Sequence, residues 1–156
     1  MMDHFSITSP NFDNHGMIPA RFTCDEANIN PELHIHQLPE GTKSLALIMD
    51  DPDASGGVFT HWTIWNIDPT TKIIKPGHVP EGAVEGVTSF NKTGYGGPCP
   101  PAGKFHRYYF KLYALGRMLD LPPSSRVEDL EHQIHANLMG KADLFLGKYK
   151  KESVIY

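Results

Sequence analysis

The fold class is decided by the stretch HRYYFKLYAL, residues 106–115. Aromatic and bulky apolar residues are frequent in strands, and successive side chains of a strand point to opposite faces. A strand here places His106, Tyr108, Phe110 and Leu112 on one face. That face therefore carries both a polar group and part of the expected core.

Two upstream stretches have the same character. The first is SLALIM, residues 44–49, which is apolar and precedes an acidic turn. The second is FTHWTIWNI, residues 59–67, which comes close to alternating apolar and polar residues. Both patterns are typical of strands in the interior of a sheet.

The remaining segments predict loops and one helix. Residues 77–86 and 94–103 are rich in Pro and Gly, which excludes a helix or a central strand there. The segment SSRVEDL, residues 124–130, gives a helix start with an acidic first turn, and Leu130, Ile134 and Leu138 recur at helical spacing. We expect one helix from about Val127 to Leu146.

The organisation of the chain is simple. Its 156 residues fit one ordinary domain, and neither an internal repeat nor a linker-like change of composition divides it. We therefore predict a single domain over residues 1–156, mainly β and antiparallel, with a C-terminal helix.

Charge and hydropathy exclude some partners. The formal net charge is −4 and no run of Lys or Arg occurs, so nucleic acid is not an expected partner. The start, MMDHFS at residues 1–6, has no basic or apolar leader, and nowhere do about 18 apolar residues run together. We expect a cytoplasmic protein without membrane insertion.

The chain has two cysteines, Cys24 and Cys99, and neither belongs to a Cys-x-x-Cys motif. Two cysteines are too few for a disulfide scaffold, which favours free thiols. A single bridge stays open, because the sequence does not give the distance between them.

Three places in the sequence can carry chemistry. Asp50-Asp51-Pro52-Asp53 follows a strand, although on its own this stretch favours a solvated acidic turn. His61 directly precedes Trp62, so one of the two should face the interior and the other away from it, and a core histidine is as good a reading as a functional one. His106 stands at a junction of loop and strand, a position that favours binding.

Metal and hydrolase sites find little support. No spacing such as His-Glu-x-x-His indicates a metal site, and no Gly-x-Ser-x-Gly elbow indicates a serine nucleophile. We expect neither a metal nor another cofactor.

Three segments, in order, resemble the signature of the phosphatidylethanolamine-binding protein family, also called the Raf kinase inhibitor protein family. They are DPDAS at residues 51–55, His61-Trp62, and Gly97-Pro98 followed by HRY at residues 106–108. Further stretches, such as IPARFTCD at residues 18–25 and GYGGPCPP at residues 94–101, resemble the bacterial branch of the family. The resemblance covers nearly the whole chain.

The resemblance implies a central antiparallel sheet packed by a smaller second sheet, with a C-terminal helix. It also implies a small pocket for phosphate-like anions at one end of the sheet. Carried over, Asp51, Pro52 and Asp53 form one wall, His61 and His106 are the imidazole donors, Gly97 and Pro98 form a loop, and Tyr108 adds a hydroxyl. Such donors suit an anion, and a neighbouring carboxylate favours the charged form of an imidazole.

The function that the resemblance implies is non-catalytic binding of a phosphate-like anion, a phosphorylated small molecule or a phosphorylated protein segment. The family includes inhibitors of kinase signalling, and its bacterial members suggest a homodimer. The alternative from another class is a phosphoester hydrolase with a histidine as base beside Asp51 or Asp53. A third reading is an interaction protein that binds partners through a sheet edge or its proline-rich loops.

The sequence departs from the family pattern at three places. Ser55 stands where the family usually has Pro, Thr88-Ser89 where many bacterial members have Asn-Asp, and Asn137 where a helix histidine is common. We expect these changes to alter the rim of the pocket.

Overall fold

The computed structural model describes residues 4–152. Residues 1–3 and 153–156 of the predicted domain lie outside the described part. The elements, in chain order, are β1 (Ser6–Thr8), the 3-10 helix η1 (Ala20–Phe22), β2 (Leu33–His36), β3 (Ser44–Asp51), β4 (Phe59–Ile67), β5 (Ile73–Ile74), β6 (Val84–Glu85), β7 (His106–Leu115), α1 (Val127–Asn137), β8 (Leu138–Lys141) and β9 (Phe145–Tyr149). The predicted bounds of the two long strands, residues 59–67 and 106–115, are confirmed, while the strand that begins at Ser44 continues to Asp51.

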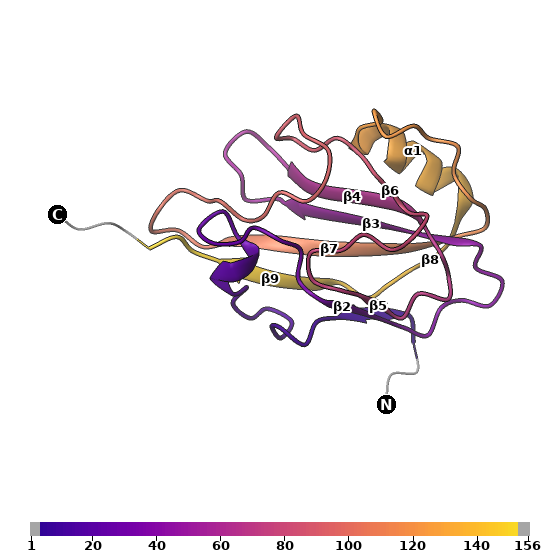
Figure 1. Ribbon diagram of the computed structural model, residues 1–156, viewed down its shortest axis with the longest axis horizontal. Helices are drawn as coiled ribbons and strands as arrows, with labels where there is room; N and C mark the ends of the chain where they lie inside the picture. Colours follow the sequence, from indigo (N-terminus) through magenta and orange to yellow (C-terminus); the bar gives the residue numbers. More distant parts are fainter. Residues whose placement is uncertain (1–3, 153–156) are drawn as a thin grey trace.

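The larger sheet has the strand order β6-β4-β3-β7-β8, and β9 also pairs with β7 (Figure 1). All pairings between these strands are antiparallel. β3 lies at the centre because it is apolar on both faces: Leu45, Leu47 and Met49 belong to one core, and Ala46 and Ile48 to the other. The sequence of a strand that is buried on both faces is a continuous apolar run, and SLALIM has this pattern.

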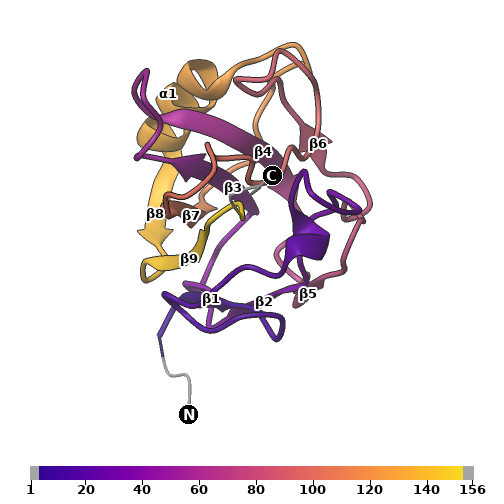
Figure 2. The same ribbon diagram turned by 90° about the vertical axis from the view of Figure 1, so that its left-hand side faces the viewer.

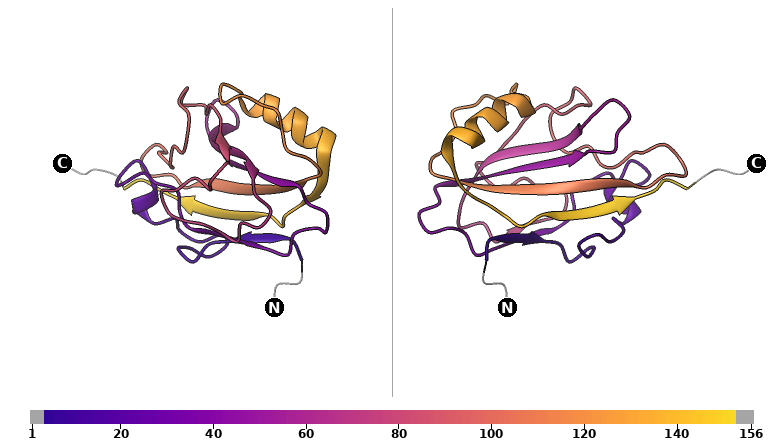
Figure 3. Two further views of the ribbon diagram at one scale, coloured as in Figure 1. Left: turned by 45° about the vertical axis from the view of Figure 1, so that its right-hand side comes forward. Right: turned by 180° about the vertical axis from the view of Figure 1, so that it is seen from behind.

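The molecule has three layers (Figure 2). A smaller sheet of order β1-β2-β5 lies along one face of the larger sheet, and α1 lies on the other face (Figure 3). Leu130 and Ile134 of α1 pack on Trp65 of β4 in the smaller core. The predicted architecture, mainly β with two sheets and a C-terminal helix, is therefore confirmed.

The alternation of β4 is broken at His61. Met49 pairs with Trp62, but the next residue, Asp50, pairs with Thr60, which makes His61 the extra residue of a β-bulge. Trp62 lies in the larger core, and the His61 ring lies 5.2 Å from the ring of Tyr108 in the same core. The prediction that these two neighbours face opposite sides was wrong, because the bulge turns both toward the smaller sheet.

The C-terminal helix is shorter than predicted. It begins at Val127, as expected, but ends at Asn137 instead of about Leu146. Its N-cap is Arg126, whose backbone N–H donates to the Asp129 carboxylate at 2.9 Å. After Asn137 the chain pairs with β7, first as β8 and then as β9. The backbone N–H and C=O groups at this edge of β7 need hydrogen-bond partners, and a longer helix would leave them unpaired.

The two cysteines form a disulfide, Cys24–Cys99, across 75 positions of sequence, with a Cα–Cα distance of 5.4 Å. The free thiols that the sequence favours are therefore wrong. Folding brings the two loops together, and the backbone N–H of Cys24 also donates to the carbonyl of Pro98 at 3.1 Å. Within residues 4–152, no helix combines the length and apolar character needed to cross a bilayer.

Candidate functional site

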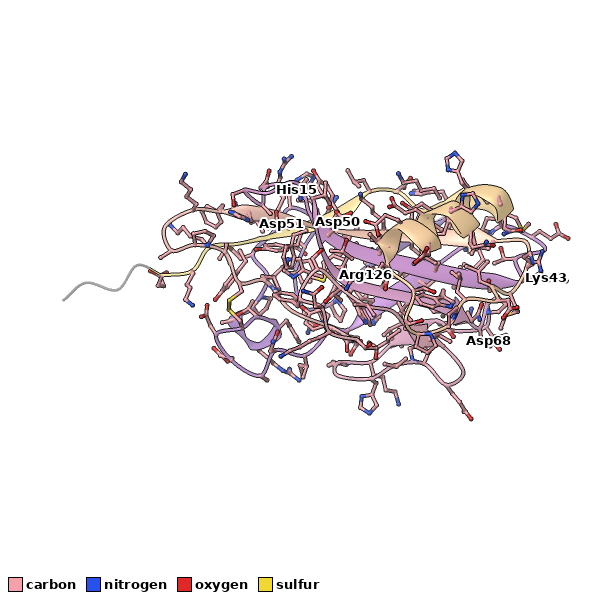
Figure 4. All side chains as sticks on the ribbon, turned by 90° about the horizontal axis from the view of Figure 1, so that it is seen from above. His15, Lys43, Asp50, Asp51, Asp68 and Arg126 are labelled. Carbon is pink, nitrogen blue, oxygen red and sulfur yellow. A yellow bond between two sulfur atoms is a disulfide. The ribbon has the colours of Figure 1, made fainter. Side chains whose placement is uncertain are left out.

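A cavity of about 370 Å³ lies where β3 ends and β4 and β7 begin. Figure 4 shows Asp50 and Asp51 together toward one end of the molecule, while Lys43, directly before β3, lies at the other end. The cavity is lined by Asp51, Asp53, Ala54, Ser55, Phe59, His61, Phe90, Cys99, Pro100, Pro101, Lys104, His106 and Tyr108. Its walls thus combine strand ends, which are rigid, with the loop that carries the disulfide.

Asp51 is the centre of the polar wall. It is 3 % exposed, and its two carboxylate oxygens have different partners. Oδ2 lies 2.6 Å from Nδ1 of His106, and Oδ1 accepts the backbone N–H of Asp53 at 2.7 Å. The solvated acidic turn that the stretch favours on its own is therefore wrong for Asp50 and Asp51, which are both buried at the end of β3.

Asp53 lines the same wall, but its carboxylate is hydrogen-bonded to Arg107. Its carboxylate accepts two bonds from the guanidinium, at 2.9 and 2.7 Å, and one from the backbone N–H of Arg107, at 2.9 Å. The hydrogen bond from the Arg107 side chain lowers the pKa of Asp53 to about 2. Asp53 is therefore a charged, bonded part of the wall rather than a proton acceptor.

His61 has one ring nitrogen committed to the backbone. Its Nδ1 lies 2.7 Å from the carbonyl oxygen of Gly96. Burial lowers the pKa of His61, and the hydrogen bond to Gly96 and the nearby Asp51 carboxylate oppose this only in part. The ring is therefore neutral at neutral pH, with its proton on Nδ1, so that Nε2 accepts a hydrogen bond instead of donating one.

Tyr108 supplies a hydroxyl. The residue is fully buried, and among the described residues its hydroxyl has no hydrogen-bond partner. The centroid of its ring lies 5.2 Å from that of His61 and 6.5 Å from that of His106. Burial raises the pKa of Tyr108, so the group is a neutral hydroxyl. A buried hydroxyl without a partner, on a residue that lines the cavity, is a candidate donor to a ligand oxygen.

Gly97 and Pro98 position the loop and do not line the cavity. The N–H of Gly97 donates to Oδ1 of Asn28 at 2.8 Å, and a Cβ at Gly97 would lie 2.2 Å from the backbone oxygen of Phe22. Only glycine fits there. Pro98 accepts the N–H of Cys24, which holds the loop beside η1.

Of the predicted site residues, five line the cavity: Asp51, Asp53, His61, His106 and Tyr108. Pro52, Gly97 and Pro98 do not. Sequence reasoning missed Phe59, Phe90 and Lys104 as wall residues. Lys104 was predictable as a wall residue, since it stands two positions before His106, whereas no feature of the sequence indicated Phe90.

The departures from the family pattern differ in place. Ser55 lines the cavity. Ser89 does not, and its hydroxyl accepts the backbone N–H of Thr60 at the start of β4. Asn137 ends α1, where its side chain donates to Gln133. Of these positions, only Ser55 is placed to alter the cavity wall directly.

The chain is similar to known proteins along most of its length. The family model for phosphatidylethanolamine-binding protein matches residues 8–149. A UPF0098 protein of Methanothermobacter thermautotrophicus is 44 % identical over 145 residues, which cover 90 % of this chain and 95 % of the relative.

Two solved structures share the fold. CT736 of Chlamydia trachomatis superposes with a TM-score of 0.91 at 31 % identity, covering 97 % of this chain and 100 % of that one. YbcL of Escherichia coli, described as a member of the mammalian PEBP family, gives a TM-score of 0.88 at 31 % identity over 95 % of this chain and 99 % of that one.

Proposed function

The chain belongs to the phosphatidylethanolamine-binding protein family, and from this premise we propose that it binds phosphate-like anions or phosphorylated ligands in the cavity without catalysing a reaction. One observation carries the proposal. Within residues 4–152, Nε2 of His61, Nε2 of His106 and the hydroxyl of Tyr108 have no hydrogen-bond partner in the protein, and they belong to three neighbouring buried side chains.

The composition of the cavity supports an anion. Lys104 is the one Lys or Arg among the lining residues, and the imidazole of His106, held at Nδ1 by Asp51, has a second ring nitrogen for an anion. Phe59 and Phe90 keep part of the wall apolar, which strengthens hydrogen bonds to a bound charge. A volume of about 370 Å³ is ample for a phosphoryl group with a small substituent.

The bonding of the carboxylates supports binding without chemistry. Asp51 uses both oxygens, one for His106 and one for the Asp53 backbone, and Asp53 is held by Arg107. Neither carboxylate is therefore free to attack a phosphoester or to orient His61 as a base. His61 has a free Nε2, and a hydrolase would use that atom.

Calorimetry with inorganic phosphate and phosphoethanolamine tests the proposal. We expect wild type to bind and His106→Ala to lose at least about tenfold in affinity, the worth of a charged hydrogen bond. The matched control, His135→Ala on the exposed side of α1, should bind like wild type. Turnover of p-nitrophenyl phosphate that disappears in His61→Ala would instead establish the hydrolase.

The disulfide bears on where the protein works. Disulfides persist in oxidising compartments and are rare in the reducing cytosol of mesophiles. We therefore propose an oxidising compartment for Cys24–Cys99 in place of the cytoplasm that the sequence favours. Acid-quenched thiol labelling of the protein in its own cells should find both cysteines blocked, and free thiols would restore the cytoplasmic expectation.

A further inference from the structure

We propose that the cavity selects a phosphate group that carries a proton, such as a singly protonated phosphomonoester, over tetrahedral anions without one, such as sulfate. The inference rests on the proposed function and deepens it. It follows from the direction of one hydrogen bond, between His61 and Gly96.

The Gly96 carbonyl fixes the tautomer of His61. A carbonyl oxygen only accepts hydrogen bonds, so Nδ1 of His61 must supply the proton across the 2.7 Å contact. The backbone N–H of Gly96 donates in return to the carbonyl of His61 at 3.0 Å, which ties the two residues together. In the neutral ring, Nε2 then carries only a lone pair toward the cavity.

The surroundings of His61 keep the ring neutral. Aromatic rings of Phe59, Phe90 and Tyr108 lie 5.0 to 5.2 Å away, and the residue is 3 % exposed. The charged and titratable groups near the ring come from β3, from the loop before β7 and from the start of β7. The carboxylates of Asp51 and Asp50 on β3 favour a proton on the ring. Positive charge on Lys104 or His106, which also line the cavity, opposes one. Burial is the strongest influence, and it lowers the pKa of His61.

The opposite side of the cavity offers donors. Nδ1 of His106 donates to the Asp51 carboxylate at 2.6 Å, and we assign Nε2–H of the same ring, which lines the cavity, to the bound anion. Tyr108, whose ring lies 5.2 Å from that of His61 and 6.5 Å from that of His106, adds an O–H. A bound anion thus meets one acceptor and two donors.

A protonated phosphate matches this pattern. Its P–O–H donates to Nε2 of His61, and its charged oxygens accept from His106 and Tyr108. Sulfate has no proton at neutral pH, so its oxygen would face a lone pair and leave Nε2 of His61 unpaired. Sites that hydrogen-bond a ligand proton reject analogues that lack it, and we expect at least about tenfold weaker sulfate binding.

Calorimetry with inorganic phosphate, phosphoethanolamine and sulfate between pH 6 and 8 tests the inference. We expect phosphate to bind at least about tenfold tighter than sulfate at pH 7. We also expect phosphoethanolamine to weaken as it loses its second proton, above about pH 6. If a proton on His61 were required instead, sulfate binding by His106→Gln, which has no second imidazole in the cavity, would also weaken with pH, and the inference would be overturned.

Two variants sharpen the test. His61→Gln presents an amide N–H in place of a fixed acceptor, so the ratio of phosphate affinity to sulfate affinity should fall toward one. His106→Gln should weaken both anions and keep their ratio. Nitrogen-15 ring spectra of the wild type should show an unprotonated Nε2 on His61, and this readout survives if a variant fails to fold.

The failures are distinguishable. Equal phosphate and sulfate affinities, with saturable shifts of the His61 and His106 rings, would overturn the proton selection and leave the anion pocket intact. Absence of binding by all three probes would overturn the proposed function as well.

Discussion

Asp50 and Asp51 are neighbours at the end of β3, yet they belong to different faces of the sheet. Both are buried, and each meets a basic side chain of β7. Asp50 pairs with Nζ of Lys111 at 2.9 Å, on the face that packs against α1, and does not line the cavity. Asp51 pairs with His106 at 2.6 Å, on the face that opens into it.

The difference shows what turns a buried ion pair into a binding site. Lys111 meets its carboxylate with its single nitrogen, whereas the imidazole of His106 keeps a second nitrogen for the cavity. The His61 bulge and the Tyr108 hydroxyl then bring further polar atoms to the same place. We conclude that the partner and the surroundings, rather than the carboxylate, give Asp51 its role.

The largest effect should come from the disulfide, whose Cys99 lines the cavity. Replacing both cysteines, Cys24→Ser with Cys99→Ser, should lower the free energy of unfolding by about 2–4 kcal/mol, because the unfolded chain loses a constraint on a long loop. Chemical denaturation measures this, and reducing the wild type should reproduce the loss. An unchanged midpoint would show that the loops hold the cavity wall without the bridge.

The next largest effect should come from replacing each of the two carboxylates by an amide, in separate variants. Asp51→Asn should weaken phosphate binding by about 10–100-fold, because it removes the charged partner of His106. Asp50→Asn should leave binding within about twofold but lower stability by about 1–3 kcal/mol, since Lys111 loses its partner. Calorimetry measures the binding of both variants and denaturation their stability. Equal losses of phosphate affinity would contradict the different roles of Asp50 and Asp51.

A smaller effect is expected from one hydroxyl. Tyr108→Phe removes a buried group that has no partner in the described chain, so stability should stay level or rise slightly while phosphate affinity falls by about 3–10-fold. The control is Tyr113→Phe, whose ring lies elsewhere along β7 and outside the cavity lining. A loss of stability without a loss of affinity would make Tyr108 a packing residue only.

The smallest effect should come from the third carboxylate, Asp53. The Arg107 side chain lowers the pKa of Asp53 from 3.8 to about 2, so the pair stabilises the fold above pH 3.8 and that stability is lost as the pH falls toward about 2. Asp53→Asn should flatten this part of the acid unfolding curve. The change should be slight and weaker in high salt, because the pair is partly exposed. A steep, salt-independent change would assign Asp53 a larger role.

Local pattern was enough to predict the long strands and the start of the helix. SLALIM, FTHWTIWNI and HRYYFKLYAL carry their own alternation or apolar runs, and Val127 follows an acidic capping segment. The end of the helix was missed because β8 and β9 exist only through pairing with β7. The disulfide was missed for a similar reason, since its two loops meet only in the folded chain.

The site was predictable where a motif residue lies on a strand. Asp51, His61, His106 and Tyr108 reach the cavity because β3, β4 and β7 are neighbours in the sheet. The bulge that turns His61 inward left no mark in the sequence. Phe90 and Lys104 reach the wall from loops whose paths depend on distant contacts, which the sequence does not specify.

The most direct test of the central claim is a titration with inorganic phosphate, followed through the histidine ring signals. We expect the signals of His61 and His106 to shift saturably with one dissociation constant, while those of the exposed His132 and His135 stay in place. Shifts of the exposed rings alone, or no saturable shift at all, would contradict a phosphate-binding cavity at the end of β3.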